Sequence, residues 1–271
     1  MKIALIDSGL GLLAAAAALR TLRPDADLVL STDPDGMPWG PRTPDDIAER
    51  ALGCARAAAE HRPDALIVAC NTASVHALDV IRAELEPGIP VIGTVPAIKP
   101  AVAAGGPIAI WATPATTGSA YQRGLIQEFA DGVEVTEIPC PGLADAVEHA
   151  DEEAIAKAVT VAAERTPAGV RTLVLGCTHY ELLHAPIRAA LGEVLDIGPG
   201  GAGRPVDPGS VGFYGSAGAV AGQAIRRASP EAVASTGGGT LLVLRSGRVE
   251  ELPPAALHYP EGRALSAGIR V

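Results

Sequence analysis

The sequence is poor in aromatic side chains, which make up 3% of its 271 residues, although 48% of the residues are hydrophobic. A core must therefore be built from Ala, Val, Leu and Ile, which suits a sheet buried beneath helices. Basic residues are also few: 21 Lys and Arg stand against 31 Asp and Glu, for a net charge of −10. Because phosphate backbones and anionic membranes would repel such a chain, we expect no nucleic acid and no membrane as partners.

Long apolar segments and metal-binding cysteine pairs are lacking as well. The apolar run at the N-terminus ends at Asp7, which is too early for a signal or membrane segment. The four cysteines, at positions 54, 70, 140 and 177, form no CxxC pair. We therefore expect no metal and no disulfide scaffold. Unpaired thiols are typical of an intracellular chain, so the predicted location is cytoplasmic.

Short apolar runs alternate with longer runs that contain alanine and charged residues. We expect strands at 2–7, 27–32, 65–70, 91–95, 107–113, 133–138, 171–177 and 194–197, and helices near 10–21, 44–61, 73–86, 96–104, 116–129, 151–165 and 180–191. Continuous apolar strands followed by amphipathic helices indicate parallel sheets covered by helices, so the predicted fold class is α/β. Beyond residue 198 the chain is rich in Gly and Pro. A helix at 216–228 and a β-hairpin around Ser246-Gly247 follow, and we assign this tail no chemistry.

Two of the expected strands end in the same way. Residues 65–72 read ALIVACNT and residues 171–179 read RTLVLGCTH, so each apolar run leads through a small residue to a cysteine and then to polar residues. This similarity hints at two related halves. In parallel sheets, ligands bind beyond the carboxyl ends of the strands, where helix N-termini present backbone N–H groups.

Other strand ends also carry polar residues that fit such a crevice. They are Asp7-Ser8-Gly9, Asp33 with Pro38-Trp39-Gly40, and Thr113 with Thr116. Together with the two cysteine motifs they supply hydroxyl and amide donors, thiols and a few acids, without an arginine. Such a set can hold a carboxylate through N–H and O–H donors and helix dipoles.

Each of these residues also has a purely structural interpretation. A lone cysteine that ends a buried strand is usually a small core residue, and Asp7-Ser8-Gly9, Asn71 and Thr72 are common helix caps. His179 can likewise be a buried, hydrogen-bonded histidine. The two thiols together favour chemistry, because a reaction that removes a proton from one face of a carbon and returns one to the other needs a base and an acid.

Racemisation is that reaction. A helix N-terminus lowers the pKa of a thiol from about 8.5 towards neutrality, which makes it a usable base. Aimed donors and desolvation would then stabilise the developing carbanion. We therefore predict that Cys70 and Cys177 act as the acid–base pair of a racemase.

The motifs resemble those of the aspartate/glutamate racemase superfamily, most closely the glutamate racemases. The resemblance covers about residues 1–215. It is carried by Ile6–Gly9, Pro38–Pro44, Ala69–Ser74, Ala112-Thr113 with Ala115-Thr116, Ser119–Tyr121 and Gly176–Tyr180. It implies two similar α/β lobes, at 1–97 with 207–271 and at 98–206, with the active site in the cleft between them and no cofactor.

The resemblance also implies the reaction and the role of each residue. Glutamate would be racemised to supply D-glutamate for peptidoglycan, with Cys70 acting on the D-enantiomer and Cys177 on the L-enantiomer. Asp7, Glu148 and His179 would be auxiliary acid–base groups. The amino acid would be held by Ser8, Asn71, Thr72, Thr113, Thr116, Thr178 and the backbone at Trp39-Gly40. Members of the family are often dimeric, so a homodimer is an expected assembly beside the small acidic substrate.

Three departures from the family pattern bear on the substrate. Gly11-Leu12 stands where two glycines are usual, Trp39 replaces the commoner Tyr, and 140–145 lacks the usual bulky residues. A racemase of aspartate or another small acid is therefore an alternative. Single-thiol decarboxylases fit less well because both cysteines are present. A non-catalytic binding protein is the alternative from a different class.

Overall fold

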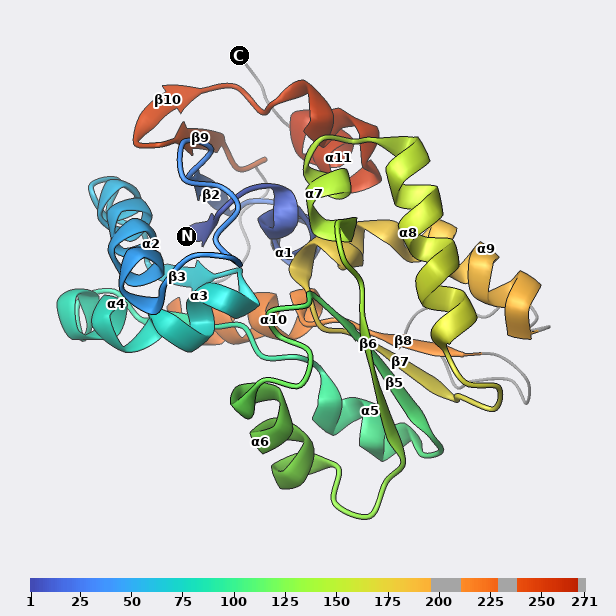
Figure 1. Ribbon diagram of the computed structural model, residues 1–271. Coiled ribbons are helices and arrows are strands. Elements are labelled where there is room, and N and C mark those ends of the chain that lie inside the picture. Colours follow the sequence, from blue (N-terminus) through green and yellow to red (C-terminus); the bar gives the residue numbers. More distant parts are fainter. Residues whose placement is uncertain (196–210, 229–237, 268–271) are drawn as a thin grey trace. The chain divides into compact units, whose positions relative to one another are not determined.

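The computed structural model describes residues 1–195, 211–228 and 238–267, and the chain divides into two compact units (Figure 1). The first unit comprises Met1–Val95 and Ser216–Val271, and the second comprises Pro96–Gly215. We had expected the chain to return to the first lobe near residue 207. Gly212–Tyr214 instead forms a strand of the second unit's sheet, so the return comes after that strand.

The first unit is built on a six-stranded sheet with the strand order β10-β9-β2-β1-β3-β4. Its strands are β1 (Lys2–Asp7), β2 (Asp27–Thr32), β3 (Ala65–Val68), β4 (Val91–Gly93), β9 (Leu241–Arg245) and β10 (Arg248–Glu250). All neighbours pair in parallel except β9 and β10. The expected hairpin is thus confirmed, and Ser246 and Gly247 both adopt the positive φ that its two-residue turn requires.

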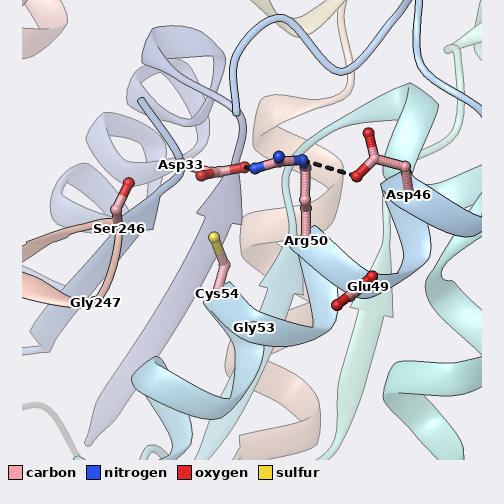
Figure 2. A pocket seen from close by; sticks show the side chains of 8 residues that line it. All are labelled: Asp33, Asp46, Glu49, Arg50, Gly53, Cys54, Ser246 and Gly247. Carbon is pink, nitrogen blue, oxygen red and sulfur yellow. Dashed lines mark hydrogen bonds and ion pairs between the residues drawn. The ribbon is translucent and has the colours of Figure 1, made fainter. Parts of the chain in front are cut away.

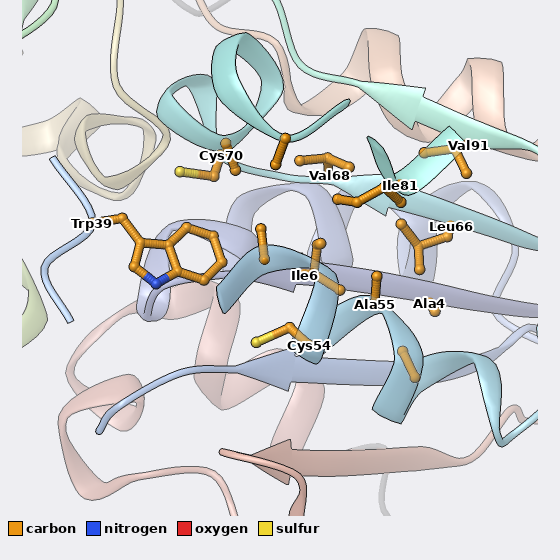
Figure 3. Close-up of a cluster of buried hydrophobic side chains, with 14 of the residues drawn as sticks. Ala4, Ile6, Trp39, Cys54, Ala55, Leu66, Val68, Cys70, Ile81 and Val91 are labelled. Atoms are coloured by element: carbon orange, nitrogen blue, oxygen red, sulfur yellow. The ribbon is translucent and has the colours of Figure 1, made fainter. Parts of the chain in front are cut away.

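Helices cover both faces of this sheet. They are η1 (Leu10–Leu12), α1 (Leu13–Leu22), α2 (Pro44–Ala59), α3 (Asn71–His76), α4 (Leu78–Leu85), α10 (Ala217–Ala228), η3 (Pro254–His258) and α11 (Pro260–Ala267). Helix α2 contacts α3, α4 and the strands β1 and β2, whereas α1 contacts α10 and α11. Ala4 and Ile6 pack with α2 in the cluster of Figure 3, and Ile3 and Leu5, which point to the opposite face, are also fully buried.

The second unit holds a four-stranded, all-parallel sheet with the order β6-β5-β7-β8. Its strands are β5 (Ile108–Ala112), β6 (Val135–Pro139), β7 (Thr172–Leu175) and β8 (Gly212–Tyr214). Its helices are α5 (Ile98–Ala104), α6 (Ala120–Phe129), α7 (Leu143–Glu148), α8 (Glu152–Arg165), η2 (Thr178–Leu183) and α9 (His184–Leu195). Ile108 and Ile110 pack in one cluster with side chains from α5 and α6. Trp111 is fully buried, and its indole N–H donates to the Thr166 hydroxyl at 3.0 Å.

The first four strands of each unit, taken along the chain, have the same order in the two sheets. In each unit the first strand is central, the second lies on one side of it, and the third and fourth lie on the other. The order therefore reverses between β1 and β3 in the first unit and between β5 and β7 in the second. Such a reversal leaves a crevice at the carboxyl ends of the two strands, because the connecting segments diverge to opposite sides.

The predicted α/β class, with parallel sheets flanked by helices, is confirmed. The strand expected at 194–197 is wrong at its first half, since Val194 and Leu195 end α9, and residues 196 and 197 lie outside the described residues. Elements α7, β8 and α11 were not expected from the sequence. No helix within the described ranges is long and apolar enough to cross a membrane.

The Trp111–Thr166 hydrogen bond yields a stability prediction. Thr166→Val should lower the free energy of unfolding by about 1–3 kcal/mol, because it leaves a buried indole N–H without its acceptor. Urea unfolding followed by circular dichroism measures the change. Thr166→Ser, which keeps the hydroxyl, and Thr160→Val, at an exposed position of α8, should stay within about 0.5 kcal/mol. Equal losses for the serine and valine variants would contradict the assignment.

Candidate active site

The reversal of strand order between β1 and β3 of the first unit brings two of the sequence motifs together. Ile6 of β1 lies beside Val68 of β3, and the Ala69 N–H donates to the Ile6 carbonyl at 2.8 Å. The next residues along the two strands, Asp7-Ser8 and Cys70, therefore leave the sheet as neighbours. The parallel pairing places these groups at one edge although more than 60 positions separate them in the chain.

Asp7 is fully buried at this edge. Its Oδ1 accepts hydrogen bonds from the Ser8 backbone N–H at 2.6 Å and from the Ser8 hydroxyl at 3.2 Å. A buried carboxyl is costly unless its oxygens are hydrogen-bonded, and Ser8 supplies that compensation locally. A polar group held in this way beside a thiol is in a position to exchange protons with a ligand at the strand ends.

Cys70 lies two residues beyond the end of β3 and is the N-cap residue of α3. Cys70, Asn71 and Trp39 are all at least nine-tenths buried, whereas Thr72 is half-buried. Trp39 and Cys70 belong to one buried cluster and lie at the same end of it in Figure 3. The structure thus brings together the expected first-lobe set, and Gly40 follows Trp39 on the same loop.

The reversal in the second unit presents a matching arrangement. Thr113 follows β5 and Cys177 follows β7, and the Gly176 N–H donates to the Trp111 carbonyl at 2.8 Å. A Cβ atom on Gly176 would lie 2.9 Å from that carbonyl oxygen, so only glycine fits before the cysteine. The Thr113 and Thr116 hydroxyls lie 3.1 Å apart and share a hydrogen bond.

Cys177, His179 and Glu148 form a hydrogen-bonded chain. The Cys177 Sγ lies 3.9 Å from His179 Nδ1, and His179 Nε2 lies 3.1 Å from Glu148 Oε2. The side chains of His179 and Glu148 are 9% and 14% exposed. With its proton on Nε2, the His179 imidazole donates a hydrogen bond to the Glu148 carboxylate and accepts one from the Cys177 thiol. These three side chains can therefore move a proton to or from the sulfur. Thr178, which lies between Cys177 and His179 in the sequence, is buried.

Two other thiols are excluded from acid–base chemistry by burial. Burial, with a smaller contribution from the charge of Asp33, raises the pKa of Cys54 to about 12. Burial, followed by the neighbouring Cys177, raises the pKa of Cys140 to about 12 as well. Both therefore stay protonated near neutral pH. Cys140 instead has a structural role, since its carbonyl accepts from the buried Tyr180 hydroxyl at 3.2 Å.

An arginine lies close to the first-unit motifs although the strand ends supplied none. Arg50 of α2 reaches Asp33, whose Oδ2 is 3.2 Å from the Arg50 guanidinium and 3.0 Å from the Trp39 indole nitrogen. A cavity of about 420 Å³ opens beside this pair (Figure 2). It is lined by Asp33, Asp46, Glu49, Arg50, Gly53, Cys54, Ser246 and Gly247. Of these, the sequence placed only Asp33 among the polar strand-end residues, and the family resemblance names none as a substrate contact.

Within 1–195, 211–228 and 238–267, no group of three or more His, Cys, Asp or Glu side chains is arranged to hold a metal ion. The polar groups at the two strand reversals are thiols, hydroxyls, amides, an imidazole and carboxyls. Such a set suits proton transfer at a carbon next to a carboxylate.

Comparison with known proteins decides the family. The family described as Asp/Glu/hydantoin racemase matches residues 11–202. The glutamate racemase of Roseiflexus sp. (strain RS-1) is 39% identical over 213 residues, which cover 74% of this chain and 77% of that protein. The chain belongs to the Asp/Glu/hydantoin racemase family.

Other members of this racemase family show the same likeness. A glutamate racemase of Pseudomonas putida is 38% identical over 70% of this chain and 72% of that protein. Among solved structures, Escherichia coli glutamate racemase in complex with L-glutamate and the activator UDP-MurNAc-Ala superposes with a TM-score of 0.75 at 25% identity, over 98% of this chain and 94% of that one. Isoform RacE1 of Bacillus anthracis gives a TM-score of 0.69 at 26% identity, over 90% and 87% of the two chains.

The difference in burial between Cys177 and two other thiols of this racemase predicts different reactivities. At pH 8, iodoacetamide should alkylate the half-buried Cys177 at least about tenfold faster than Cys54 or Cys140. The reason is that a raised pKa leaves almost no thiolate until the pH approaches 12. Peptide mass spectrometry over time measures the rates, and unfolding in guanidinium should remove the difference. Equal rates in the native protein would show that the buried thiols are not held protonated.

Proposed function

We propose that this racemase interconverts L- and D-glutamate without a cofactor, with Cys70 and Cys177 as the two acid–base groups. One observation carries the proposal: each unit places its cysteine at the same point, after the third strand and at the strand-order reversal. Identity of 39% to a glutamate racemase supports the substrate. The Escherichia coli relative, which binds L-glutamate, supports it further.

The proposed reaction balances without an external reagent. From L-glutamate, the Cys177 thiolate takes the Cα proton and becomes a thiol, and the electron pair stays on the substrate as a carbanion. The Cys70 thiol then delivers its proton to the opposite face and becomes a thiolate. The reverse reaction starts at Cys70. The mechanism therefore requires that the two thiols act on opposite faces of one Cα atom.

The neighbouring groups have distinct proposed tasks. Glu148 orients the His179 imidazole, which exchanges protons with Cys177. Asp7 does the corresponding work beside Cys70. The hydroxyl, amide and backbone donors bind the ammonium and carboxylate groups of glutamate and stabilise the carbanion. They are Ser8, Asn71, Thr72, Thr113, Thr116, Thr178 and the backbone at Trp39-Gly40.

The biological setting follows from the same proposal. D-glutamate made in this way would serve peptidoglycan synthesis, and the proposed location is cytoplasmic. A homodimer is the proposed assembly.

The substrate is tested by proton NMR of L- and D-glutamate, and then of aspartate, incubated with the protein in heavy water. Loss of the Cα proton signal with decay of optical rotation identifies the substrate. If the Cα proton of aspartate exchanges and that of glutamate does not, the substrate is aspartate and not glutamate. Binding without exchange would indicate a non-catalytic protein.

Removal of either proposed base should abolish racemisation. Cys70→Ala and Cys177→Ala should each lower kcat at least about 100-fold, because each half-reaction loses its proton carrier. The rate is measured by circular dichroism of the substrate, which follows the change in its optical activity. Far-ultraviolet spectra that match those of the unchanged protein show that a variant has kept its fold. Cys54→Ala, which removes a thiol outside the site, should keep activity close to that of the unchanged protein. Near-normal turnover by either site variant would exclude the two-thiol mechanism.

Loss of the Glu148 charge should slow the proton transfer at Cys177 more than that at Cys70. Glu148→Gln should lower kcat about tenfold or more, because the imidazole loses the carboxylate that orients it. Deuterium at Cα locates the slow step. The variant should show a larger isotope effect with deuterated L-glutamate, whose deuteron leaves to Cys177, than with deuterated D-glutamate. Equal isotope effects from the two enantiomers would place Glu148 outside the Cys177 step.

A further inference from the structure

The loop that carries Trp39-Gly40 is held by hydrogen bonds between residues that are close together in the sequence. It runs from the end of β2 to Thr43, whose hydroxyl caps α2 by accepting from the Asp46 N–H at 3.3 Å. Within it, the Gly36 N–H donates to the Asp33 carbonyl at 3.1 Å and the Arg42 N–H donates to the Trp39 carbonyl at 3.1 Å. The path of the loop is therefore tied at both ends.

The Asp33 carboxylate joins this loop to the body of the unit. Asp33 is 7% exposed, and its Oδ2 accepts from the Trp39 indole N–H at 3.0 Å and from the Arg50 guanidinium at 3.2 Å. Because the acceptor is charged, both hydrogen bonds are of the stronger kind. The same contact raises the pKa of Arg50, chiefly through the hydrogen bond to Asp33. One oxygen thus connects a loop tryptophan to helix α2.

The remaining contacts hold the arginine in place. Asp46 accepts from Arg50 Nε at 2.9 Å and from Arg42 at 2.6 Å, and Arg42 Nε donates to the Gly36 carbonyl at 2.5 Å. A Cβ atom on Gly36 would overlap both the Arg50 guanidinium and the Asp33 carboxylate. The backbone thus passes so close to the ion pair that any larger residue at position 36 would force the Arg50 and Asp33 side chains to shift. Figure 2 shows Arg50 reaching from α2 between Asp33 and Asp46.

We propose that Asp33 is a positioning residue of the racemase: by bridging Arg50 and the Trp39 indole, it fixes the Trp39-Gly40 segment that binds the substrate. The inference rests on the proposed function for the identity of that substrate. Asp33 itself lines the cavity of Figure 2 and acts only through Trp39. Its loss should therefore weaken substrate binding while the thiols keep their chemistry, so KM should rise more than kcat falls.

A double-mutant cycle distinguishes this role from a general structural one. Asp33→Asn removes the charge at nearly unchanged size, and Trp39→Phe keeps an aromatic ring but removes the N–H donor. Each should raise KM for L- and D-glutamate about tenfold, and the double variant should resemble Trp39→Phe alone. Additive effects, about 100-fold in the double variant, would mean that Asp33 does not act through the indole and would overturn the proposal.

Two controls accompany the cycle. Asp35→Asn alters an exposed carboxylate of the same loop that pairs with Arg248, and it should leave KM close to that of the unchanged protein. Arg50→Lys keeps a positive charge but loses the guanidinium fork, and it should raise KM in the same direction as Asp33→Asn. If Asp33→Asn does not fold, the Arg50→Lys series with Trp39→Phe carries the same cycle.

Fluorescence tests the positioning without any substrate. Trp39 and Trp111 are the two tryptophans of the chain, so Trp111→Phe isolates the Trp39 emission. In that background Asp33→Asn should increase acrylamide quenching of Trp39, which is 1% exposed in the structure, whereas Asp35→Asn should not. Unchanged quenching would contradict the proposal. If the unchanged protein fails to racemise glutamate but quenching rises, the proposed function fails while the positioning of Trp39 by Asp33 stands.

Discussion

The parallel pairing of β1 with β3 and of β5 with β7 is the constraint on which the rest of the site depends. In each pair the strands end at the same edge, and the chain beyond them diverges to opposite sides of the sheet. Residues at these ends follow the last paired residues of the two strands, which is where ligands bind in parallel sheets of this kind. Asp7 and Cys70 in one unit, and Thr113 and Cys177 in the other, owe their positions to this geometry alone.

The two units support their cysteines in different ways. Beside Cys70 lies a fully buried carboxyl, Asp7, that is hydrogen-bonded to its own neighbour in the chain. Beside Cys177 lies an imidazole that a distant carboxylate, Glu148, holds in place. The strand order is therefore repeated, while the titratable groups beside the two cysteines differ. Such an asymmetry suits a reaction whose two half-steps handle mirror-image substrates.

Buried charge recurs around the first-unit motifs. Desolvating a carboxylate costs far more than one hydrogen bond returns, so it is tolerated only where several donors converge. Asp33 meets this condition through the Trp39 indole and Arg50, and the backbone of Gly36 passes close to both side chains. This arrangement fixes the position of the loop that carries Trp39, because a charged hydrogen bond ties it to helix α2. The hairpin β9–β10, which lies beyond the residues matched by the family, extends the same sheet beside β2.

Local pattern alone determined the α/β class, the bounds of β1 and β2, the hairpin turn and the cysteines at two alike strand ends. Those features depend on hydrophobic period and on residues close together in the chain. The tertiary structure decided which strand ends meet, that α9 continues through Val194 and Leu195, and that Glu148 reaches His179 from 31 residues away. It also decided that Arg50, which the sequence marked only as part of an amphipathic helix, pairs with Asp33. Such contacts between distant residues follow from strand order and register, which no local pattern of side chains encodes.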